Sequence, residues 1–438
     1  MKHVSSTTER DRAVILNVVR RFGPISRVQI HELTEMRQTS ISQLTRLLID
    51  QGQLVKTGLA DNPMGRKQIL LDINKESSFI LSIDFDAEKA SAAVTDLHPR
   101  ILKIRSEPTC LDQGANGLLE QLARLGREVL ADAQISPNDL SGIGIGDPGL
   151  SDSRSGISIL SSTIDFWRDI PTRKFFEEVF GVPAILGNNT RCKALSEFVL
   201  SGAEMPENVA YIEYTRGIGS ALIVGGKVLE GHHWSAGEFG HTRISDGGPP
   251  CRCGSFGCLE ALAGASAVEG RIRSILLAGG TSRASSLVDG KIDDITTWTV
   301  FEAARQGDKV CRTIIEDVGR NLGFGLANLV NLFDPALIVL DKHLELAGPE
   351  LLDQIVRTVK MQSLAHNCED LEFRFAKFGE DAGILGAALM VLERLFEIPA
   401  LRPPKFLIDE ARAPKNARAQ AYSSSMTAST LNSVSGHR

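Results

Sequence analysis

From residue 78 onward, short runs of β-branched and aliphatic residues alternate with longer amphipathic stretches. Strand-like runs such as SFILSIDF, SGIGIGDPGL and NVAYIEYT are separated by helical patterns such as GLLEQLARLGREVLADA. This alternation is typical of α/β folds, in which helices cover a central sheet. The chain has 438 residues, of which 42% are hydrophobic and 23% charged, so it is long enough for two or three packed domains. We therefore expect an α/β body of two lobes with a cleft between them.

Targeting and membrane signals are missing from the printed sequence. It contains no run of 18 apolar residues, and its opening, MKHVSSTTERDRAVIL, lacks the apolar segment and cleavage site of a signal peptide. We expect a cytoplasmic protein with no membrane insertion. Thiols stay reduced in that compartment, which favours metal binding over disulfides where cysteines cluster. The segment 399–438 is rich in Pro, Ala and Ser, which predicts a disordered tail.

The N-terminal segment, residues 1–75, differs from the rest in charge. It holds 12 Lys and Arg against 7 Asp and Glu, a balance of +5, whereas the whole chain carries −6 and the remainder therefore −11. A basic end on an acidic protein is where an anionic partner would bind.

Three helices are predicted in this basic segment. DRAVILNVVRRFG ends at Gly23-Pro24, Ser26 and Gln29 fit a capping box that begins a second helix, and a third helix follows the turn at 35–37. The residues expected to face inward are Val14, Leu16, Val18, Val19 and Phe22 in the first helix, Val28, Ile30 and Leu33 in the second, and Ile41, Leu44, Leu47 and Leu48 in the third.

The segment then continues as GQLVKTGLADNPMGRKQILLDI, which predicts two strands joined by a loop that holds Arg66 and Lys67. Three helices followed by such a wing indicate a winged helix-turn-helix domain over residues 1–75, whose third helix enters a major groove while a wing Arg enters a narrow minor groove. The alternative is a protein-interaction module; the positive balance and the basic wing favour DNA. The expected DNA contacts are Gln38, Thr39, Ser42, Thr45 and Arg46 of the third helix, with Arg66 and Lys67 of the wing.

Three of the seven cysteines lie within eight positions of one glycine-rich loop. The stretch GEFGHTRISDGGPPCRCGSFGCLE supplies His241, Cys251, Cys253 and Cys258, the nitrogen and sulfur ligands that zinc prefers. A Cys-x-Cys pair forms a local disulfide poorly, and a nucleophilic thiol needs one activated cysteine rather than three. One His and three Cys make a closed, structural zinc site; the alternative is a glycine-rich loop with incidental thiols.

The same loop resembles a family signature. Gly237-Glu238-Phe239-Gly240-His241 followed by Cys251-x-Cys253-Gly254-x-x-Gly257-Cys258-x-Glu260 is similar to the motif of the ROK family (repressors, open reading frames and kinases). The N-terminal winged helix-turn-helix is similar to that of the repressor branch, which includes regulators of xylose, glucose and N-acetylglucosamine genes. The resemblance covers residues 10 to 398.

This resemblance implies an actin-like, two-lobed sugar-kinase fold with a hexose-type ligand in the cleft. The first lobe would comprise residues 78–200 plus 381–398, and the second lobe 201–380 with the zinc loop. The family's sugar-binding residues fall on Asn188, Glu238, His241 and Glu260. In the family the histidine contacts sugar through one ring nitrogen and zinc through the other, so the metal would fix the ring.

The chain departs from the kinase members of the family at the catalytic base. The kinases carry an Asn-Asp pair, and here Asn188 is followed by Asn189, with Glu197 on the acid found eight residues later. An amide cannot accept the proton of a sugar hydroxyl, so the resemblance implies that kinase chemistry is disabled.

The nucleotide loops differ as well. In place of Asp-x-Gly-Gly-Thr the first loop reads Asp84-Phe85-Asp86-Ala87-Glu88, whose added bulk and carboxylates disfavour phosphate. The second loop, at 215–219, is partly kept, and the adenosine loop reads Leu340-Asp341-Lys342-His343 where the family has a pair of glycines.

We interpret the chain as a sugar-responsive transcriptional regulator, a repressor of carbohydrate genes, whose kinase domain has become a sensor. We expect a homodimer or homotetramer on a palindromic, A·T-rich operator in double-stranded DNA, and structural Zn²⁺ as the cofactor. Two alternatives remain: an active or bifunctional ATP-dependent sugar kinase, and a regulator controlled by a protein partner.

Overall fold

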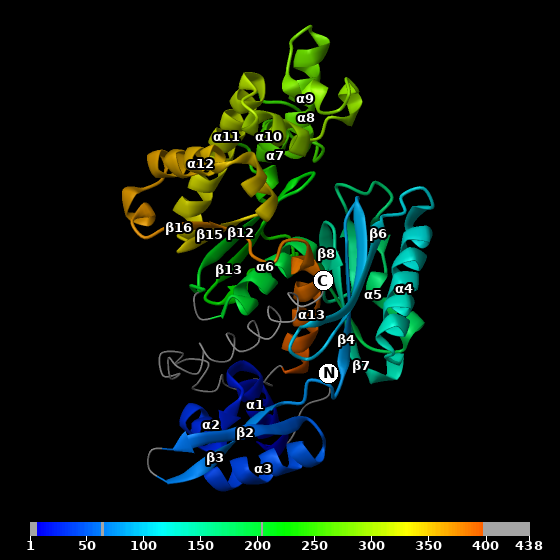
Figure 1. Ribbon diagram of the computed structural model, residues 1–438, viewed down its shortest axis with the longest axis vertical. Helices are drawn as coiled ribbons and strands as arrows, with labels where there is room; N and C mark the ends of the chain where they lie inside the picture. Colours follow the sequence, from blue (N-terminus) through cyan, green and yellow to red (C-terminus); the bar gives the residue numbers. More distant parts are fainter. Residues whose placement is uncertain (1–6, 63–64, 203–204, 397–438) are drawn as a thin grey trace, which may run out of the picture.

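The computed structural model describes residues 7–62, 65–202 and 205–396 and builds them into two α/β lobes and a small helical domain (Figure 1). The α/β sugar-kinase-like architecture predicted from the sequence is confirmed. The predicted tail, 399–438, lies outside the described residues. Within those residues, no helix combines the length and the apolar character that crossing a membrane requires.

The two lobes repeat one sheet pattern, an antiparallel three-stranded meander followed by two strands parallel to its first strand. The sheet orders are β11-β7-β4-β5-β6 in the first lobe and β14-β13-β12-β15-β16 in the second. The first sheet comprises β4 (Phe79–Phe85), β5 (Lys89–Thr95), β6 (Ile101–Pro108), β7 (Leu140–Asp147) and β11 (Ala184–Asn188). The second comprises β12 (Val209–Tyr214), β13 (Ile218–Val224), β14 (Lys227–Val228), β15 (Leu337–Leu340) and β16 (Glu372–Phe375).

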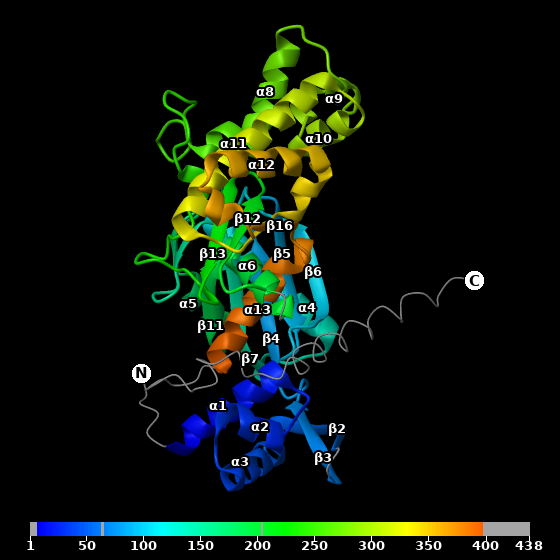
Figure 2. The same cartoon turned by 90° about the vertical axis from the view of Figure 1, so that its left-hand side faces the viewer.

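Helices cover both sheets, because each helix carries a stripe of apolar residues, with a period of 3.6 residues, that packs against a sheet. The first lobe has α4 (Gly114–Ala133) and α5 (Thr172–Phe180), with a small sheet of β8 (Leu150–Asp152), β9 (Ile157–Leu160) and β10 (Arg168–Ile170). The second lobe has α7 (Leu259–Ala263), α8 (Ala265–Leu277), α9 (Arg283–Ser286), α10 (Thr297–Arg305), α11 (Lys309–Phe333) and α12 (Pro349–Gln362) (Figure 1 and Figure 2). Short 3₁₀ turns, η3 (Phe239–His241) and η5 (Lys342–Ala347), carry residues of the cleft.

The last described helix, α13 (Ala382–Leu395), returns to the first lobe. It packs on β4 and β7 and lies beside α6 (Asn189–Leu200), which also contacts β13 of the second lobe. The contact with α6 is close: a Cβ at Gly386 would lie 1.8 Å from the carbonyl oxygen of Cys192. The pair α6 and α13 therefore occupies the middle of the molecule, between the two sheets (Figure 1).

The N-terminal domain is a winged helix-turn-helix. It contains α1 (Thr7–Phe22), α2 (Arg27–Thr34) and α3 (Gln38–Asp50), followed by the antiparallel strands β2 (Leu54–Asn62) and β3 (Gly65–Ile73), with β1 (Ile25–Ser26) paired to β3. The capping box of Ser26 and Gln29 is present at the start of α2.

Three details of this domain differ from the sequence prediction. The side chains of Val28 and Leu47 are 39% and 42% exposed, although the sequence predicted that they face inward. Thr45 is buried instead, and its hydroxyl tolerates burial because it donates to the carbonyl of Ile41 one turn earlier. The predicted wing loop is also shorter than expected, since β3 begins at Gly65 and already includes Arg66 and Lys67.

The winged domain shares a hydrophobic core with the C-terminal end of α13. Buried side chains of α1 pack in one cluster with Leu389, Leu392 and Phe396. The side-chain amide of Asn17 donates to the carbonyl of Phe396 at 2.9 Å, and the guanidinium carbon of Arg20 lies 5.4 Å from the centre of the Phe396 ring. The winged helix-turn-helix domain therefore packs against the C-terminal end of α13, a helix of the first lobe.

Candidate ligand site and metal cluster

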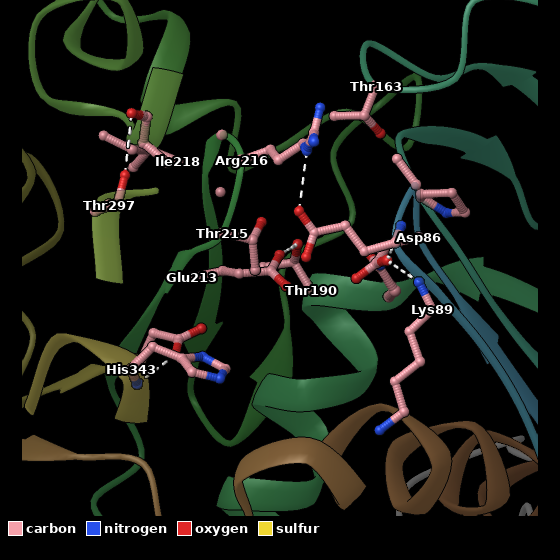
Figure 3. A pocket seen from close by; sticks show the side chains of 18 of the residues that line it. Asp86, Lys89, Thr163, Thr190, Glu213, Thr215, Arg216, Ile218, Thr297 and His343 are labelled. Atoms are coloured by element: carbon pink, nitrogen blue, oxygen red, sulfur yellow. Dashed lines mark hydrogen bonds and ion pairs between the residues drawn. The ribbon is translucent and has the colours of Figure 1, made fainter. Parts of the chain in front are cut away.

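A cavity of about 770 Å³ lies between the lobes, at the carboxyl ends of the parallel strands of both sheets (Figure 3). Such strand ends are where α/β folds place their ligands. The cavity is lined by Asp84 of β4, Asn188 of β11, Glu213 of β12 and Asp341 just after β15. All four residues predicted to bind sugar line it, namely Asn188, Glu238, His241 and Glu260, and so does Asn189.

Asn188 and Asn189 sit at the start of α6, and their amides bind nearby backbone. Asn188 caps the helix: its side-chain oxygen accepts from the N–H of Arg191 at 3.1 Å, and its Nδ2 donates to the carbonyl of Gly149 at 2.8 Å. An amide has a second lone pair and a second N–H, which leaves Asn188 capacity toward the cavity. Asn189 is nearly buried, and its Nδ2 points to the carbonyl of Phe85 at 3.4 Å.

Glu238, His241 and Glu260 come from the loop that follows β14. Glu238 precedes η3, His241 ends it, and Glu260 lies in the first turn of α7, where its Oε2 accepts from the N–H of Ile218 at 3.0 Å. Gly217 permits this approach, because a Cβ there would lie 2.3 Å from the same carboxylate oxygen. Burial raises the pKa of Glu238; the charge of Glu260 adds to the rise, and His241 and Arg191 oppose it.

The four predicted metal ligands lie together. The ligand atoms of His241, Cys251, Cys253 and Cys258 all fall within 4.8 Å of one another. His241 Nδ1 is 3.6 Å from Cys251 Sγ, and Cys253 Sγ is 3.7 Å from Cys258 Sγ. Tetrahedral coordination with metal–sulfur bonds of about 2.3 Å gives sulfur–sulfur edges of about 3.8 Å, so this donor set could hold a metal ion. His241 belongs to both the cluster and the cavity wall.

In two other loops that line the cavity, acidic side chains accept hydrogen bonds from backbone N–H groups. Asp86 Oδ1 accepts from the N–H of Glu88 at 2.7 Å and of Lys89 at 2.9 Å. Asp341 accepts from the N–H of His343 at 2.9 Å, and its Oδ1 lies 2.8 Å from His343 Nδ1. The hydrogen bond to Asp341 raises the pKa of His343. The family resemblance assigns these two loops to nucleotide binding, and free backbone N–H groups are donors that phosphates use.

An ion pair also bridges the lobes. Arg216, in the turn between β12 and β13, places its Nε 3.0 Å from the carboxylate of Glu88, in the turn between β4 and β5 (Figure 3). Both side chains are exposed, so the pair contributes little to stability, but it joins the β4–β5 turn of the first lobe to the β12–β13 turn of the second.

A buried charge network between these regions was not predicted from the sequence. Glu213 bonds both Thr190 and Lys193 of α6. Burial opposes the charge of Lys193, but Glu213 and Asp84 outweigh it and raise the pKa of this ammonium well above its ordinary value. Burial raises the pKa of Asp84 to about 7, and its Oδ1 has no partner among the described residues. One signal was available: Lys193 follows Asn189 by one helical turn and therefore shares its face.

The predicted DNA contacts lie on the winged domain, away from the cavity. The side chains of Gln38, Thr39, Ser42, Arg46 and Lys67 are exposed, those of the first four on α3. The side chain of Arg66 is outside the described part of the chain, and Thr45 is buried rather than exposed.

Comparisons with known proteins place these features in context. The sequence profile of the ROK family matches residues 80–394. The chain is 27% identical over 389 residues to a protein of Caldicellulosiruptor bescii named Xylose repressor, which covers 89% of this chain and 97% of that one. It is 28% identical over 365 residues to the DNA-binding transcriptional dual regulator NagC of Escherichia coli K12, and the match covers 83% of this chain and 87% of NagC.

Solved structures give the same grouping. A ROK family transcriptional regulator, described as a homolog of the E. coli MLC protein, superposes with a TM-score of 0.77 at 25% identity and covers 93% of this chain and 99% of its own. A ROK family glucokinase from Streptomyces griseus, in complex with glucose and AMPPNP, superposes with a TM-score of 0.63 at 27% identity and covers 72% and 99%. Regulators and kinases are therefore both among its structural neighbours.

Proposed function

The chain belongs to the ROK family, and we propose that within it this protein is a sugar-responsive DNA-binding regulator, a repressor of carbohydrate uptake or catabolism genes. One observation supports the proposal: a winged helix-turn-helix domain is joined to a cavity in which Asp86 and Asp341 accept from backbone N–H groups of the two loops that the family resemblance assigns to nucleotide. A chain that kept kinase function would need those N–H groups for ATP.

The sugar ligands in this proposal are Asn188, Glu238, His241 and Glu260. An amide, two carboxylates and an imidazole around one cavity match the donors and acceptors of adjacent hydroxyl groups. The metal is Zn²⁺ held by His241, Cys251, Cys253 and Cys258, because nitrogen and sulfur ligands in tetrahedral array select zinc. With four protein ligands the ion is a structural one; it would hold the His241 ring and its loop in place.

The same reasoning makes the protein a sensor rather than an enzyme. Asn189 stands where the kinase members have Asp, and an amide is no general base. The lining residues of the cavity include eleven Asp or Glu against five Lys or Arg, an unfavourable field for a polyphosphate.

Coupling to DNA would run through α13. Its first turn adjoins the cavity, where a Cβ at Gly383 would lie 2.2 Å from Asp84 Oδ2, and its last turn is followed by Phe396 in the core of the winged domain. Sugar-induced lobe movement that shifts α13 would move the DNA-binding domains of a homodimer or homotetramer relative to a palindromic operator. A coupling free energy of about 1–3 kcal/mol changes operator affinity roughly 5–150-fold.

The test starts with thermal unfolding of the purified protein in a panel of pentoses, hexoses and N-acetyl sugars. Each sugar that raises the unfolding midpoint is then added to protein bound to fragments selected from genomic DNA. We expect at least one sugar both to stabilise the protein and to change DNA affinity within the coupling range above. Failure of a broad panel would favour control by a protein partner, and ATP-dependent turnover of a sugar would favour the kinase.

A further inference from the structure

Arg27, the first residue of α2, is tied to the recognition helix α3. Its Nε donates to the hydroxyl of Thr45 at 2.7 Å. Thr45 is completely buried, and its hydroxyl in turn donates to the carbonyl of Ile41 at 2.7 Å, so its position is fixed by the helix itself. The guanidinium of Arg27 is thus held at one place beside α3 while its two terminal nitrogens keep four N–H donors.

A second cation stands next to it. Arg46 directly follows Thr45 on α3, and its side chain is exposed. Burial of Arg27 lowers the pKa of its guanidinium, and the positive charge of Arg46 lowers it further. Among the described residues, neither Arg27 nor Arg46 forms an ion pair with a carboxylate. Two neighbouring guanidinium groups without an acidic partner repel each other, and an anion between them would relieve that repulsion.

The location of Arg27 and Arg46 indicates which anion they would bind. Ser42 and Arg46 belong to the exposed face of α3, which in our proposed function enters the major groove, and backbone phosphates line both edges of that groove. From this geometry we infer that Arg27 and Arg46 grip one backbone phosphate of duplex DNA, with Thr45 as the positioning residue that aims Arg27. The inference rests on the proposed function and extends the contact surface from α3 to α2.

The test measures binding of a mixed-sequence 30-base-pair duplex by the full-length protein, by fluorescence anisotropy over a series of KCl concentrations. A duplex without an operator is sufficient, because phosphate contacts do not depend on sequence. For Arg27→Gln we expect affinity to fall about tenfold and the slope of log affinity against log salt to become shallower by about 1. Arg46→Gln, at an exposed position that folding tolerates, should give a similar loss of slope.

Two further variants separate aim from charge. Arg27→Lys and Thr45→Val both keep the positive charge, so the salt slope should stay near that of the wild type while affinity falls a few-fold. Thr45→Ser keeps the hydroxyl and should restore the affinity that Thr45→Val loses. The control is Arg127→Gln, which removes one exposed positive charge from α4 and should change neither quantity.

Each outcome has one meaning. Wild-type slope in both Arg27→Gln and Arg46→Gln, with unchanged unfolding midpoints, would overturn the phosphate contact while leaving the proposed function intact. A wild-type protein that binds no duplex even at low salt would overturn the proposed function itself. If inorganic phosphate competes with DNA far better than chloride at equal ionic strength, and does so equally in Arg27→Gln, the pair is not the anion site.

Discussion

The two halves of the cavity between the lobes use carboxylates in opposite ways. Near the metal cluster, Glu238 and Glu260 line the cavity. Only one oxygen of Glu260 accepts from the N–H of Ile218, so further carboxylate oxygens can accept hydrogen bonds from a ligand. In the half next to the strand ends of β4 and β15, Asp86 and Asp341 fold back onto their own backbones. The two sets of carboxylates line one continuous cavity, and they differ in which hydrogen-bonding groups remain available to a ligand.

This contrast teaches how a kinase scaffold can become a sensor. In the proposed function, Asn189 takes the position of the kinases' base and cannot accept a proton, but this change would not by itself prevent ATP from binding. In our proposed function, the second step is the internal bonding of N–H groups in the loops that the family resemblance assigns to nucleotide: Asp86 and Asp341 accept from them, which leaves fewer donors for a phosphate. The exposed ion pair of Glu88 with Arg216 joins two turns of the same cavity. The chain would then respond to one ligand only.

The largest effect is expected at the proposed metal site. Cys258→Ser removes the most buried of its four ligands, so we expect metal content, measured by plasma emission spectrometry, to fall from one ion per chain to a small fraction. Because the metal loop carries His241 and Glu260, sugar-induced stabilisation should disappear too. Cys110→Ser, which changes a cysteine outside the cluster, is the matched control. Full sugar response in metal-free Cys258→Ser protein would show that the metal does not order this half.

A smaller effect separates the two carboxylate roles directly. Glu238→Gln should weaken sugar binding roughly 10–100-fold, since a charge-assisted hydrogen bond to a ligand is worth about 1.5–3 kcal/mol. Asp341→Asn should leave sugar affinity within about twofold while lowering stability, because the hydrogen bonds of Asp341 go to the backbone of His343 and Tyr214 rather than to the predicted sugar ligands. Isothermal titration calorimetry measures both. Equal losses of affinity in the two variants would break the distinction between the halves.

Local sequence patterns were enough for some of these features. The capping box of Ser26 and Gln29 and the spacing from Cys251 to Cys258 involve residues close in the chain, so composition and spacing predict them. The apolar spacing of the helices was less decisive: Leu47 follows Leu44 by three positions yet is exposed. Thr45 is buried in its place, which is possible because its hydroxyl donates to the carbonyl of Ile41 in the same helix.

Other features depend on contacts that no spacing encodes. The sequence placed Asp86 and Asp341 in two loops that depart from the family pattern, but only the folded turns show that they accept from neighbouring N–H groups. The partnership of Lys193 with Glu213 joins α6 to the second sheet, and the bond from Asn17 to Phe396 spans 379 positions. The four residues that the family resemblance predicts as sugar ligands do line the cavity, whereas the hydrogen bonds of Asp86 and Asp341 required the three-dimensional structure.

A further prediction concerns pH. Burial raises the pKa of Asp84 to about 7 from an unfolded value near 3.8, so between these values the folded state binds the extra proton. Stability should therefore fall as pH rises from about 4 to 7, and the loss should persist at higher pH. Asp84→Asn removes this contribution, and we expect it to stabilise the protein at pH 8 by about 1–2 kcal/mol and to flatten the profile. Urea unfolding at pH 5 and pH 8 measures the difference; a variant less stable at pH 8 would contradict the assignment.

The smallest expected effect comes from restoring the base alone. Asn189→Asp should give no ATP-dependent phosphorylation of any sugar in a coupled assay, because the N–H groups of Glu88 and Lys89 remain bound to Asp86. Adding Asp86→Gly to Asn189→Asp frees those two donors, so ATP binding should become detectable by calorimetry in the double variant and not in the single one. Turnover by Asn189→Asp alone would mean that the nucleotide half is open after all, and that this chain differs from a kinase at a single residue.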